Sequence, residues 1–527
     1  MACTGRAALK KVFWFFSSEK NKPCFLRPGL QARCPGRKLT RLTYRGRLGK
    51  DQMVNAPESL GASLTGILER QRAAFLAAPR PTAAERQADL RKIEHAITRN
   101  KASIADALIA DFGSRAKPET VLSEIMPSIA AAAFARRRVA GWMRARHRAV
   151  ALNFSPAVNR VEYTPKGVVG VVAPWNYPFY LTLGPLIDII AAGNRCMIKP
   201  SELTPASSAL LASMLGEVFP PEQVAVVQGD VAVGRAFCAL PFDHLLFTGS
   251  TSIGREVMRA AAENLVPVTL ELGGKSPVIV ANDYDPEKAA RSVAVGKFFN
   301  AGQTCTAPDY ALVLDERAER FAQAVLASAE EMYPTLNGNP DYTAIISDRH
   351  HARLTDLVAE AEAGGATVLR HKDTPSGNIR HFPPTIVLDP PLDSRLMRDE
   401  IFGPILPVVR TKGTDDAIAF VNARPRPLAL YPYTSDKPTE RKILDHTVSG
   451  GVTVNSTMLH VGQEDLPFGG IGPSGIGAYH GREGFQEFSH ARAVHTPRFF
   501  SGFEMLRPPY RAKMRLALRA MAGFDTK

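Results

Sequence analysis

Short apolar segments rich in β-branched residues alternate with helical segments from about residue 162 to residue 410, and this alternation limits the fold more than any other feature. Strands that alternate with helices form parallel, doubly wound sheets. The expected strands form a first series, EYTPKGVVGVV (162–172), RCMIK (195–199), VAVVQG (224–229), HLLFTGS (244–250) and VPVTLELGG (266–274), and a second, PVIVA (277–281), YALVLD (310–315), TIVLD (385–389) and ILPVVR (405–410). The sequence therefore predicts an α/β protein with two doubly wound domains and a site in the cleft between them.

Positive charge is concentrated at the N-terminus. Residues 1–52 contain 13 Lys or Arg against two acidic residues, so they hold a surplus of 11 of the net charge of +14 and leave +3 for the rest. A nearly neutral body argues against a nucleic-acid partner. We predict that this basic tail lies outside the fold and that translation starts at Met53, with an Arg-rich transit peptide as the alternative.

The body of the chain shows the pattern of a protein from a reducing compartment. Apolar residues at helical spacing predict a helical leader over 83–150. Cys196, Cys238 and Cys305 have neither zinc-site nor disulfide-scaffold spacing, so we expect no metal and a cytoplasmic location. No apolar run reaches the roughly 18 residues of a membrane span. We predict that the basic segment 507–522 is a surface or dimer-contact helix and not a membrane anchor.

A tight turn joins a strand to a helix within LLFTGSTSIGREVM (245–258). Gly249 and Gly254 lie at this turn, and a helix starting near Ile253 would offer free backbone N–H groups to a pyrophosphate. Thr251 stands where the dinucleotide-binding G-x-G-x-x-G fingerprint has its second glycine. A phosphate site and a purely structural turn are therefore both open interpretations.

Glu271 lies about 20 residues after that turn, where the dinucleotide rule expects the carboxylate that binds the ribose hydroxyls. Its context, LELGGKSP, instead places it at the end of an apolar strand before a sharp turn. Apolar neighbours raise the pKa of a carboxyl group and favour a general base. A carboxylate that only caps the turn is the alternative.

Cys305 follows a helix in a polar loop of small residues, FFNAGQTCTAPDY (298–310). This context separates it from Cys196, within a strand, and Cys238, in AFCAL, which we interpret as packing residues. Oxidation by covalent addition followed by hydrolysis needs a thiol and a base that activates water. Cys305 is therefore a candidate nucleophile.

Seven motifs carry a resemblance to a known family: APWNYP (173–178), KPSE (199–202), FTGS (247–250), ELGGK (271–275), GQTC (302–305), EIFGP (400–404) and PFGG (467–470). Their order resembles that of the aldehyde dehydrogenase superfamily, and the resemblance covers roughly residues 60–500. The subgroup resembles the class 3 fatty and aromatic aldehyde dehydrogenases, and among them the coniferyl aldehyde dehydrogenases, in NAGQTCTAPDY (300–310), MRDEIFGPILP (397–407), PLALY (427–431) and GIGPSGIGAYHGREGFQEFSH (470–490).

The resemblance implies a role for each catalytic candidate. Cys305 would attack the aldehyde to form a thiohemiacetal, and Asn176 would donate its side-chain amide, with the Cys305 backbone N–H, to the oxyanion. After hydride transfer a thioester remains, and Glu271 would activate the water that releases the carboxylic acid.

The resemblance also implies a nicotinamide cofactor. Lys199 and Glu202 would hold the adenine ribose, so the ribose carboxylate is Glu202 and not Glu271. The other cofactor-binding residues implied are Trp175, Gly249, Ser250, Gly254, Leu272, Glu400 and Phe402. Because a carboxylate near the ribose 2′ position disfavours the extra phosphate of NADP, we expect NAD, with NADP as an alternative.

The family architecture implies a homodimer and several domains. The expected segments are the basic tail (1–52), a Rossmann-like cofactor domain (53–147 and 164–273), a catalytic domain (274–475), a small β oligomerisation element (148–163 and 476–500) and a C-terminal basic helix (501–527). His350 and His351 are expected on a solvated helix start, and His460 near the substrate entrance.

The sequence favours oxidation of an aromatic or hydrophobic aldehyde such as coniferyl aldehyde. A medium-chain fatty aldehyde dehydrogenase is the alternative, since substrate size depends on loop shape. A non-catalytic binding protein would be expected to lack Cys305, Glu271 or Asn176, and all three are present. A reductase of acyl phosphates or acyl-CoA would not need a water-activating carboxylate, so Glu271 argues against it.

Overall fold

The computed structural model describes residues 56–151, 154–377, 379–499 and 508–523. The chain divides into two units, Met1–Val54 and Asn55–Lys527, and only the second contains described residues. The predictions for the basic tail and for Met53 therefore lie outside the described residues.

The second unit begins with helices. These helices are α1 (Ala56–Ala77), α2 (Ala83–Arg99), α3 (Lys101–Phe112), α4 (Lys117–Thr120), the π-helix η1 (Val121–Ile125) and α5 (Met126–Trp142). The predicted helical segment 83–150 contains α2 to α5 but ends in a short strand, β1 (Arg146–Arg148). Thr82 and Glu85 form a capping box that starts α2. Gly113 ends α3 in the left-handed region, with φ of 83°, where glycine carries no steric penalty.

A six-stranded sheet follows, in the order β15-β7-β6-β3-β4-β5. Its strands are β3 (Val168–Val172), β4 (Arg195–Lys199), β5 (Val224–Val226), β6 (His244–Gly249), β7 (Val268–Leu272) and β15 (Gly475–Ile476). The helices between them are α6 (Tyr180–Ala192), α7 (Pro205–Gly216), α8 (Val231–Cys238) and α9 (Thr251–Ala262). All pairings are parallel except that of β15, which pairs antiparallel with β7 and places Gly475 opposite Glu271.

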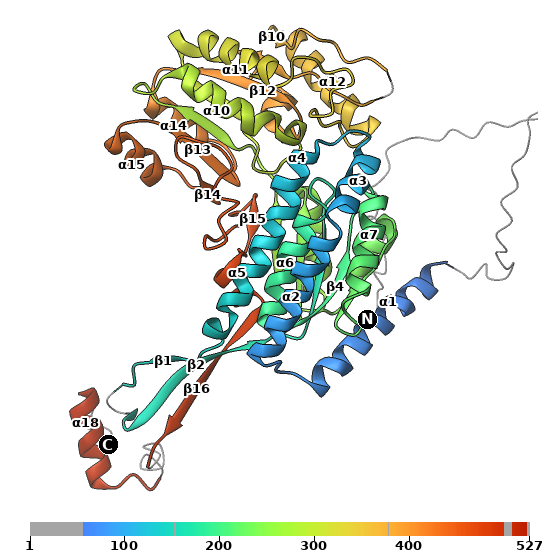
Figure 1. Ribbon diagram of the computed structural model, residues 1–527. Helices are drawn as coiled ribbons and strands as arrows, with labels where there is room; N and C mark the ends of the chain where they lie inside the picture. The colour runs from blue at the N-terminus through green and yellow to red at the C-terminus, as the bar shows by residue number, and fades with distance from the viewer. Residues whose placement is uncertain (1–55, 152–153, 378, 500–507, 524–527) are drawn as a thin grey trace, which may run out of the picture. The chain divides into compact units, whose positions relative to one another are not determined.

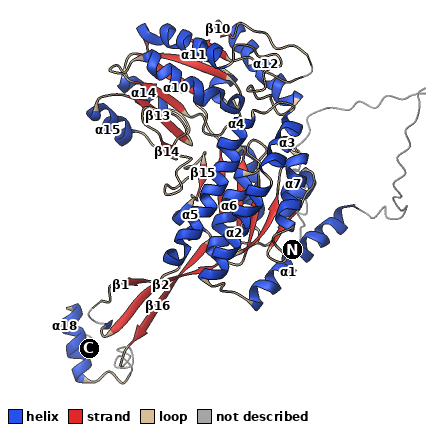
Figure 2. Cartoon of the chain, in the orientation of Figure 1, coloured by secondary structure: helices blue, strands red, loops and turns tan. Residues whose placement is uncertain are grey.

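A seven-stranded sheet has the order β10-β11-β12-β9-β8-β13-β14 (Figure 2). Its strands are β8 (Pro277–Val280), β9 (Tyr310–Leu314), β10 (Thr367–Arg370), β11 (Thr385–Leu388), β12 (Ile405–Thr411), β13 (Ala429–Tyr433) and β14 (Gly451–Val452). Its helices are α10 (Pro286–Phe298), η3 (Phe299–Gly302), η4 (Asp315–Arg317), α11 (Ala318–Met332), α12 (Asp348–Ala363), α13 (Arg395–Arg398), α14 (Thr414–Asn422) and α15 (Lys437–His446). Only β10 pairs antiparallel, with β11.

A three-stranded antiparallel sheet has the order β1-β2-β16. It consists of β1 (Arg146–Arg148), β2 (Ala157–Pro165) and β16 (Ser489–Pro497), and α16 (Gly481–Glu487) immediately precedes β16. The long β2–β16 pairing joins segments more than 300 residues apart, from Ser489 opposite Pro165 to Pro497 opposite Ala157. The last described helix is α18 (Ala512–Ala522), within the basic segment predicted to be helical.

Helix α6 is the central helix of the first half. All of its residues are buried, and it packs against α2 and α5 (Figure 1). Leu183, Leu186 and Ile190 belong to the apolar core shared with the six-stranded sheet, where each buried side chain contributes about 1.5–3 kcal/mol. This packing fixes the start of α6 and therefore the loop before it.

The two large sheets confirm the predicted fold class, and most strands lie within a residue or two of their predicted ends. Helix α9 begins at Thr251 and not near Ile253, because the Ser250 side chain accepts a hydrogen bond from the Ile253 backbone N–H and so caps the helix. Among the described helices, none is long and apolar enough to cross a membrane.

Candidate active site

Cys305 lies on the loop that joins α10 to β9. Three consecutive residues before it, Asn300, Ala301 and Gly302, have φ of 51°, 50° and 72°. Such a left-handed run is costly for non-glycine residues, and strained backbone of this kind clusters at active sites. The buried Gln303 amide holds the turn, because its Nε2 donates to the carbonyls of Asn300 and Ala344 at 3.1 and 3.0 Å.

The Cys305 thiol is half-buried, and its environment disfavours the thiolate. Burial, followed by the charges of Glu400 and Glu271, raises its pKa to about 12. The resting thiol is therefore protonated and must release its proton when it attacks. Cys196 and Cys238 are buried in the apolar core, where burial also raises their pKa values.

Glu271 lies on β7 and is 3% exposed. Neither of its carboxylate oxygens has a hydrogen-bond partner among the described residues. Burial, followed by the nearby charge of Glu487, raises its pKa well above the usual value. A carboxyl group in this state can take up a proton near neutral pH, as a general base must.

Asn176 lies in the loop between β3 and α6 and is 3% exposed. Its Nδ2 donates to the carbonyl of Gln303 at 3.1 Å, so the structure joins Asn176 directly to the Cys305 loop. An amide nitrogen has two hydrogens, and the second is free of this bond.

The predicted phosphate turn follows β6. Ser250 is exposed and directly precedes the 12-residue helix α9. Its side chain caps the N-terminus of this helix. A Cβ on Gly254 would lie 2.5 Å from the Leu272 side chain, so glycine allows α9 to pack closely on β7. These contacts explain Gly254 and Leu272 by helix–sheet packing.

Lys199 and Glu202 form an ion pair at the end of β4, with 3.5 Å between Nζ and Oε2. The Lys199 side chain is 3% exposed and that of Glu202 is 41% exposed. The carboxylate therefore faces solvent, while the buried ammonium is fixed by the Pro200 carbonyl at 2.8 Å.

Glu400, Trp175 and Phe402 form a third group of predicted cofactor residues. Oε1 of Glu400 has no partner within the described part of the chain, and burial, followed by the charge of Asp309, raises its pKa to about 8. The rings of Trp175 and Phe402 meet edge to face at 5.3 Å. A Cβ on Gly273 would collide with the Glu400 carboxylate.

The prediction of solvated histidines is wrong for His350. Both His350 and His351 are half-buried at the start of α12, and His350 packs edge to face on Trp175 at 5.1 Å. Burial lowers the pKa of His350 to about 4. His460 is held by Thr453, with 2.8 Å between its Nδ1 and the hydroxyl.

Sequence reasoning missed three charged residues, Arg115, Glu119 and Glu124, which bond to the backbone of Asn176, Asn300 and Phe179, respectively. The signal was two acids five residues apart in KPETVLSEI, a segment that continues into an apolar helix. Charged residues are almost never fully buried unless they are paired. Applying that rule requires knowing which residues are buried, and the sequence does not show this.

These residues fit a nicotinamide dinucleotide. The unpartnered Glu400 oxygen can accept a ribose hydroxyl, and the exposed Glu202 carboxylate beside Lys199 can accept a second pair of hydroxyls. Within the described residues, no group of three or more His, Cys, Asp or Glu could hold a metal ion.

Comparisons with known proteins agree with this site. Residues 48–494 match the model of the aldehyde dehydrogenase family. The "Probable coniferyl aldehyde dehydrogenase" of Pseudomonas aeruginosa is 50% identical over 447 residues, covering 85% of this chain and 94% of the relative. The chain therefore belongs to the aldehyde dehydrogenase family. It is an aldehyde-oxidising oxidoreductase.

Two solved structures extend the comparison. The substrate-bound state of Staphylococcus aureus AldH is 35% identical, with a TM-score of 0.81, covering 87% of this chain and 99% of that one. An aldehyde dehydrogenase of Mycobacterium tuberculosis complexed with NAD+ is 29% identical, with a TM-score of 0.76, covering 84% and 91%. A nicotinamide cofactor is therefore supported for this chain.

Proposed function

We propose that this protein oxidises an aromatic or hydrophobic aldehyde, with coniferyl aldehyde as the first candidate, to the carboxylic acid, using NAD as the hydride acceptor. The relative named for coniferyl aldehyde supports the substrate. The observation that carries the chemistry is a half-buried Cys305 thiol within the electrostatic reach of the buried Glu271, whose carboxylate oxygens have no hydrogen-bond partner among the described residues.

In the first half of the reaction, Cys305 Sγ forms a bond to the aldehyde carbon, and the thiol proton passes to solvent water. The carbonyl oxygen becomes an oxyanion, which the free Nδ2 hydrogen of Asn176 and the Cys305 backbone N–H stabilise. Each such donor contributes about 3–4 kcal/mol to lowering the barrier. Asn176 is ready for this role because its other hydrogen is fixed by Gln303.

A bound nicotinamide would accept the hydride that leaves the thiohemiacetal carbon. The product on the protein is a Cys305 thioester. Glu271 then takes a proton from the attacking water, a second tetrahedral oxyanion forms at the same donors, and its collapse releases the acid and the thiol. The raised pKa of Glu271 makes it a stronger base for this step.

The cofactor preference rests on Glu202. Lys199, Glu202 and Glu400 would hold the two ribose groups, and the N-terminus of α9 with Ser250 would face the pyrophosphate. A carboxylate beside the 2′-hydroxyl repels the 2′-phosphate of NADP, so NAD is favoured.

The test is NADH formation by the full-length protein with coniferaldehyde, benzaldehyde, hexanal and decanal, each with NAD and with NADP. We expect coniferaldehyde to give the highest kcat/KM and Cys305→Ala to be inactive. A preference for decanal would assign the enzyme to fatty aldehydes. No activity with any member of the panel would overturn the proposal.

We also infer a cytoplasmic homodimer with the predicted domain boundaries. Free Cys196, Cys238 and Cys305 suit a reducing compartment. Strand β16 is the edge of its sheet and most of its side chains are exposed, which leaves its backbone groups available to a second copy. Light scattering of the purified protein measures the mass, and a monomer would exclude this assembly.

A further inference from the structure

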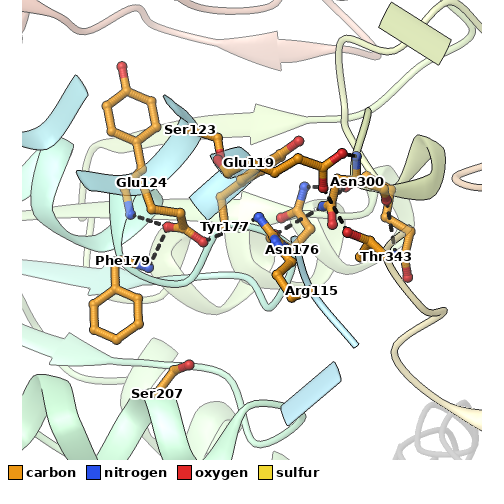
Figure 3. Close-up of polar contacts among 12 residues, drawn as sticks. Arg115, Glu119, Ser123, Glu124, Asn176, Tyr177, Phe179, Ser207, Asn300 and Thr343 are labelled. Atoms are coloured by element: carbon orange, nitrogen blue, oxygen red, sulfur yellow. Dashed lines mark hydrogen bonds and ion pairs between the residues drawn. The ribbon is translucent and has the colours of Figure 1, made fainter. Parts of the chain in front are cut away.

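Three charged side chains lie buried beside Asn176, on the segment between α3 and α5 (Figure 3). Arg115, Glu119 and Glu124 are 2%, 7% and 0% exposed. Charges are costly to bury unless they are paired and hydrogen-bonded. Their partners therefore show what this segment holds in place.

Arg115 binds the backbone of Asn176 by a hydrogen bond. Its Nη1 donates to the Asn176 carbonyl at 3.0 Å, and its Nη2 lies 3.6 Å from Oε1 of Glu124. The guanidinium also lies over the rings of Phe112 and Tyr177, at 4.8 and 5.1 Å. Together these contacts fix the orientation of the Arg115 guanidinium.

Glu124 fixes the start of α6, four residues after Asn176. Its Oε2 accepts hydrogen bonds from the backbone N–H groups of Phe179 and Tyr180, at 3.0 and 2.8 Å. A carboxylate at a helix N-terminus satisfies groups that the helix itself leaves unpaired. The loop that carries Asn176 is thus held at its C-terminal end.

Glu119 fixes the turn that carries Cys305. Its two oxygens accept from the Asn300 backbone N–H at 3.2 Å and from the Thr343 hydroxyl at 2.7 Å. Asn300 in turn donates from Nδ2 to the carbonyls of Asn176 and Gln303, at 3.2 and 3.1 Å. The Asn176 carbonyl therefore accepts from both Arg115 and Asn300, and Glu119 fixes the backbone of Asn300.

The π-helix η1 lets both acids face this site. It begins directly after Glu119 and Thr120, and the Met126 backbone N–H donates to the Val121 carbonyl five residues back. Residues five apart lie closer to one face on a π turn than on an α-helix, and such turns are frequent at functional sites.

We propose that Arg115, Glu119 and Glu124 are positioning residues that hold the oxyanion site by fixing the Asn176 loop against the Cys305 turn. This inference rests on the proposed role of Asn176 as an oxyanion donor. None of the three needs to touch the substrate, so their effect on the reaction passes through Asn176.

Arg86 provides a matched control. It is also buried, at 3% exposed, and its Nη1 donates to the Ala191 carbonyl at 2.8 Å, near the opposite end of α6. Arg86→Met removes the same kind of arginine-to-carbonyl bond, but at the far end of α6 and away from the site. A purely structural role for Arg115 predicts the same kinetic effect for both variants.

The experiment is a double-mutant cycle of Arg115→Met and Asn176→Ala in the full-length protein, with coniferaldehyde and NAD. We expect Arg115→Met alone to lower kcat about ten- to a hundredfold, since small misplacements cost this much, with KM changed less than about threefold. In the Asn176→Ala background the same change should lower kcat less than about threefold, because coupled residues are not additive. Arg86→Met should leave kcat unchanged.

A second readout needs no dinucleotide. With 4-nitrophenyl acetate, the Cys305 sulfur bonds to the acetyl carbon and its thiol proton passes to water. The carbon–oxygen bond breaks to release 4-nitrophenolate, and water then hydrolyses the thioester to acetate and the free thiol. The same oxyanion donors serve this reaction, so the same coupling is expected. Hydride transfer cannot account for a loss seen here.

Three results would overturn the inference. Multiplicative losses in the double variant would show that Arg115 does not act through Asn176, as would an Arg86→Met loss equal to that of Arg115→Met. Full activity of Asn176→Ala would refute the proposed oxyanion role itself, and the inference with it. If Arg115→Met does not fold, the same cycle is measured with Arg115→Lys, which keeps the charge and one donor nitrogen, and the expected loss is smaller.

Discussion

Two groups of buried carboxylates differ in whether their oxygens have partners. Glu119 and Glu124 each accept two hydrogen bonds and lie in the field of Arg115. Oε1 of Glu124 accepts no hydrogen bond from the described residues, but it forms an ion pair with Arg115 at 3.6 Å. In the described structure, Glu271 has no partner on either oxygen and Glu400 has none on Oε1. Buried polar groups are normally satisfied, so an exception needs an explanation.

The difference separates residues that hold the site from residues that react or bind in it. A satisfied carboxylate fixes its neighbours, whereas an unpartnered one is available to water or a ligand. Strain of this kind is tolerated at functional sites because the surrounding structure compensates for it. The comparison predicts that substitutions in the two groups will act on different quantities.

The largest expected effect is on turnover. Glu271→Gln should lower steady-state kcat about 10²–10⁴-fold, as loss of a general base does, and the Cys305 thioester should accumulate. Because the base must be deprotonated, wild-type hydrolysis should decline as pH falls through the raised pKa of Glu271. Rapid-quench trapping with mass spectrometry measures the thioester. Unchanged hydrolysis in this variant would remove Glu271 from the mechanism.

The second effect is on stability and concerns Arg115, the counter-charge of Glu119 and Glu124. Arg115→Met should lower the free energy of unfolding by about 3–5 kcal/mol, because it leaves buried carboxylates without their counter-charge. Chemical denaturation of the full-length protein measures this change. A loss below that of Arg86→Met would contradict the importance given to the pairing of Arg115 with Glu124.

The third effect has the opposite sign. Since the folded pKa of Glu271 lies above the unfolded value near 4.5, its contribution to stability is complete below pH 4.5 and is lost as pH rises through the folded pKa. Glu271→Gln should therefore be more stable than wild type at alkaline pH, by about 1–3 kcal/mol, and nearly equal at pH 5. Thermal melting of both proteins at both pH values checks this. If Glu271→Gln is less stable than wild type at alkaline pH, Glu271 has partners.

The smallest effect concerns the exposed carboxylate. Glu202→Ser should raise kcat/KM for NADP relative to NAD by about two- to fivefold, a modest change because water screens a half-exposed charge. Glu217→Ser, another exposed acid, is the control. No change in the cofactor ratio would place the ribose phosphate away from Glu202.

The strands were readable from the sequence because they depend on local apolar runs. RCMIK was predicted as a strand, and β4 covers the same residues, Arg195–Lys199. The start of α9 was misplaced because capping by Ser250 involves side-chain geometry that periodicity does not report. His350 was wrongly expected in solvent, because its burial depends on Trp175, which is distant in sequence.

The sequence by itself determined the fold class, the family and the identity of Cys305, Glu271 and Asn176 as candidates, because these follow from local patterns and ordered motifs. Only the tertiary structure decided which carboxylates are satisfied and which are not. Glu119 meets Asn300 across 181 residues of sequence and Arg115 meets Asn176 across 61. The chemical state of a buried charge depends on such neighbours, because burial and the nearest charges decide its pKa, and packing alone brings them together.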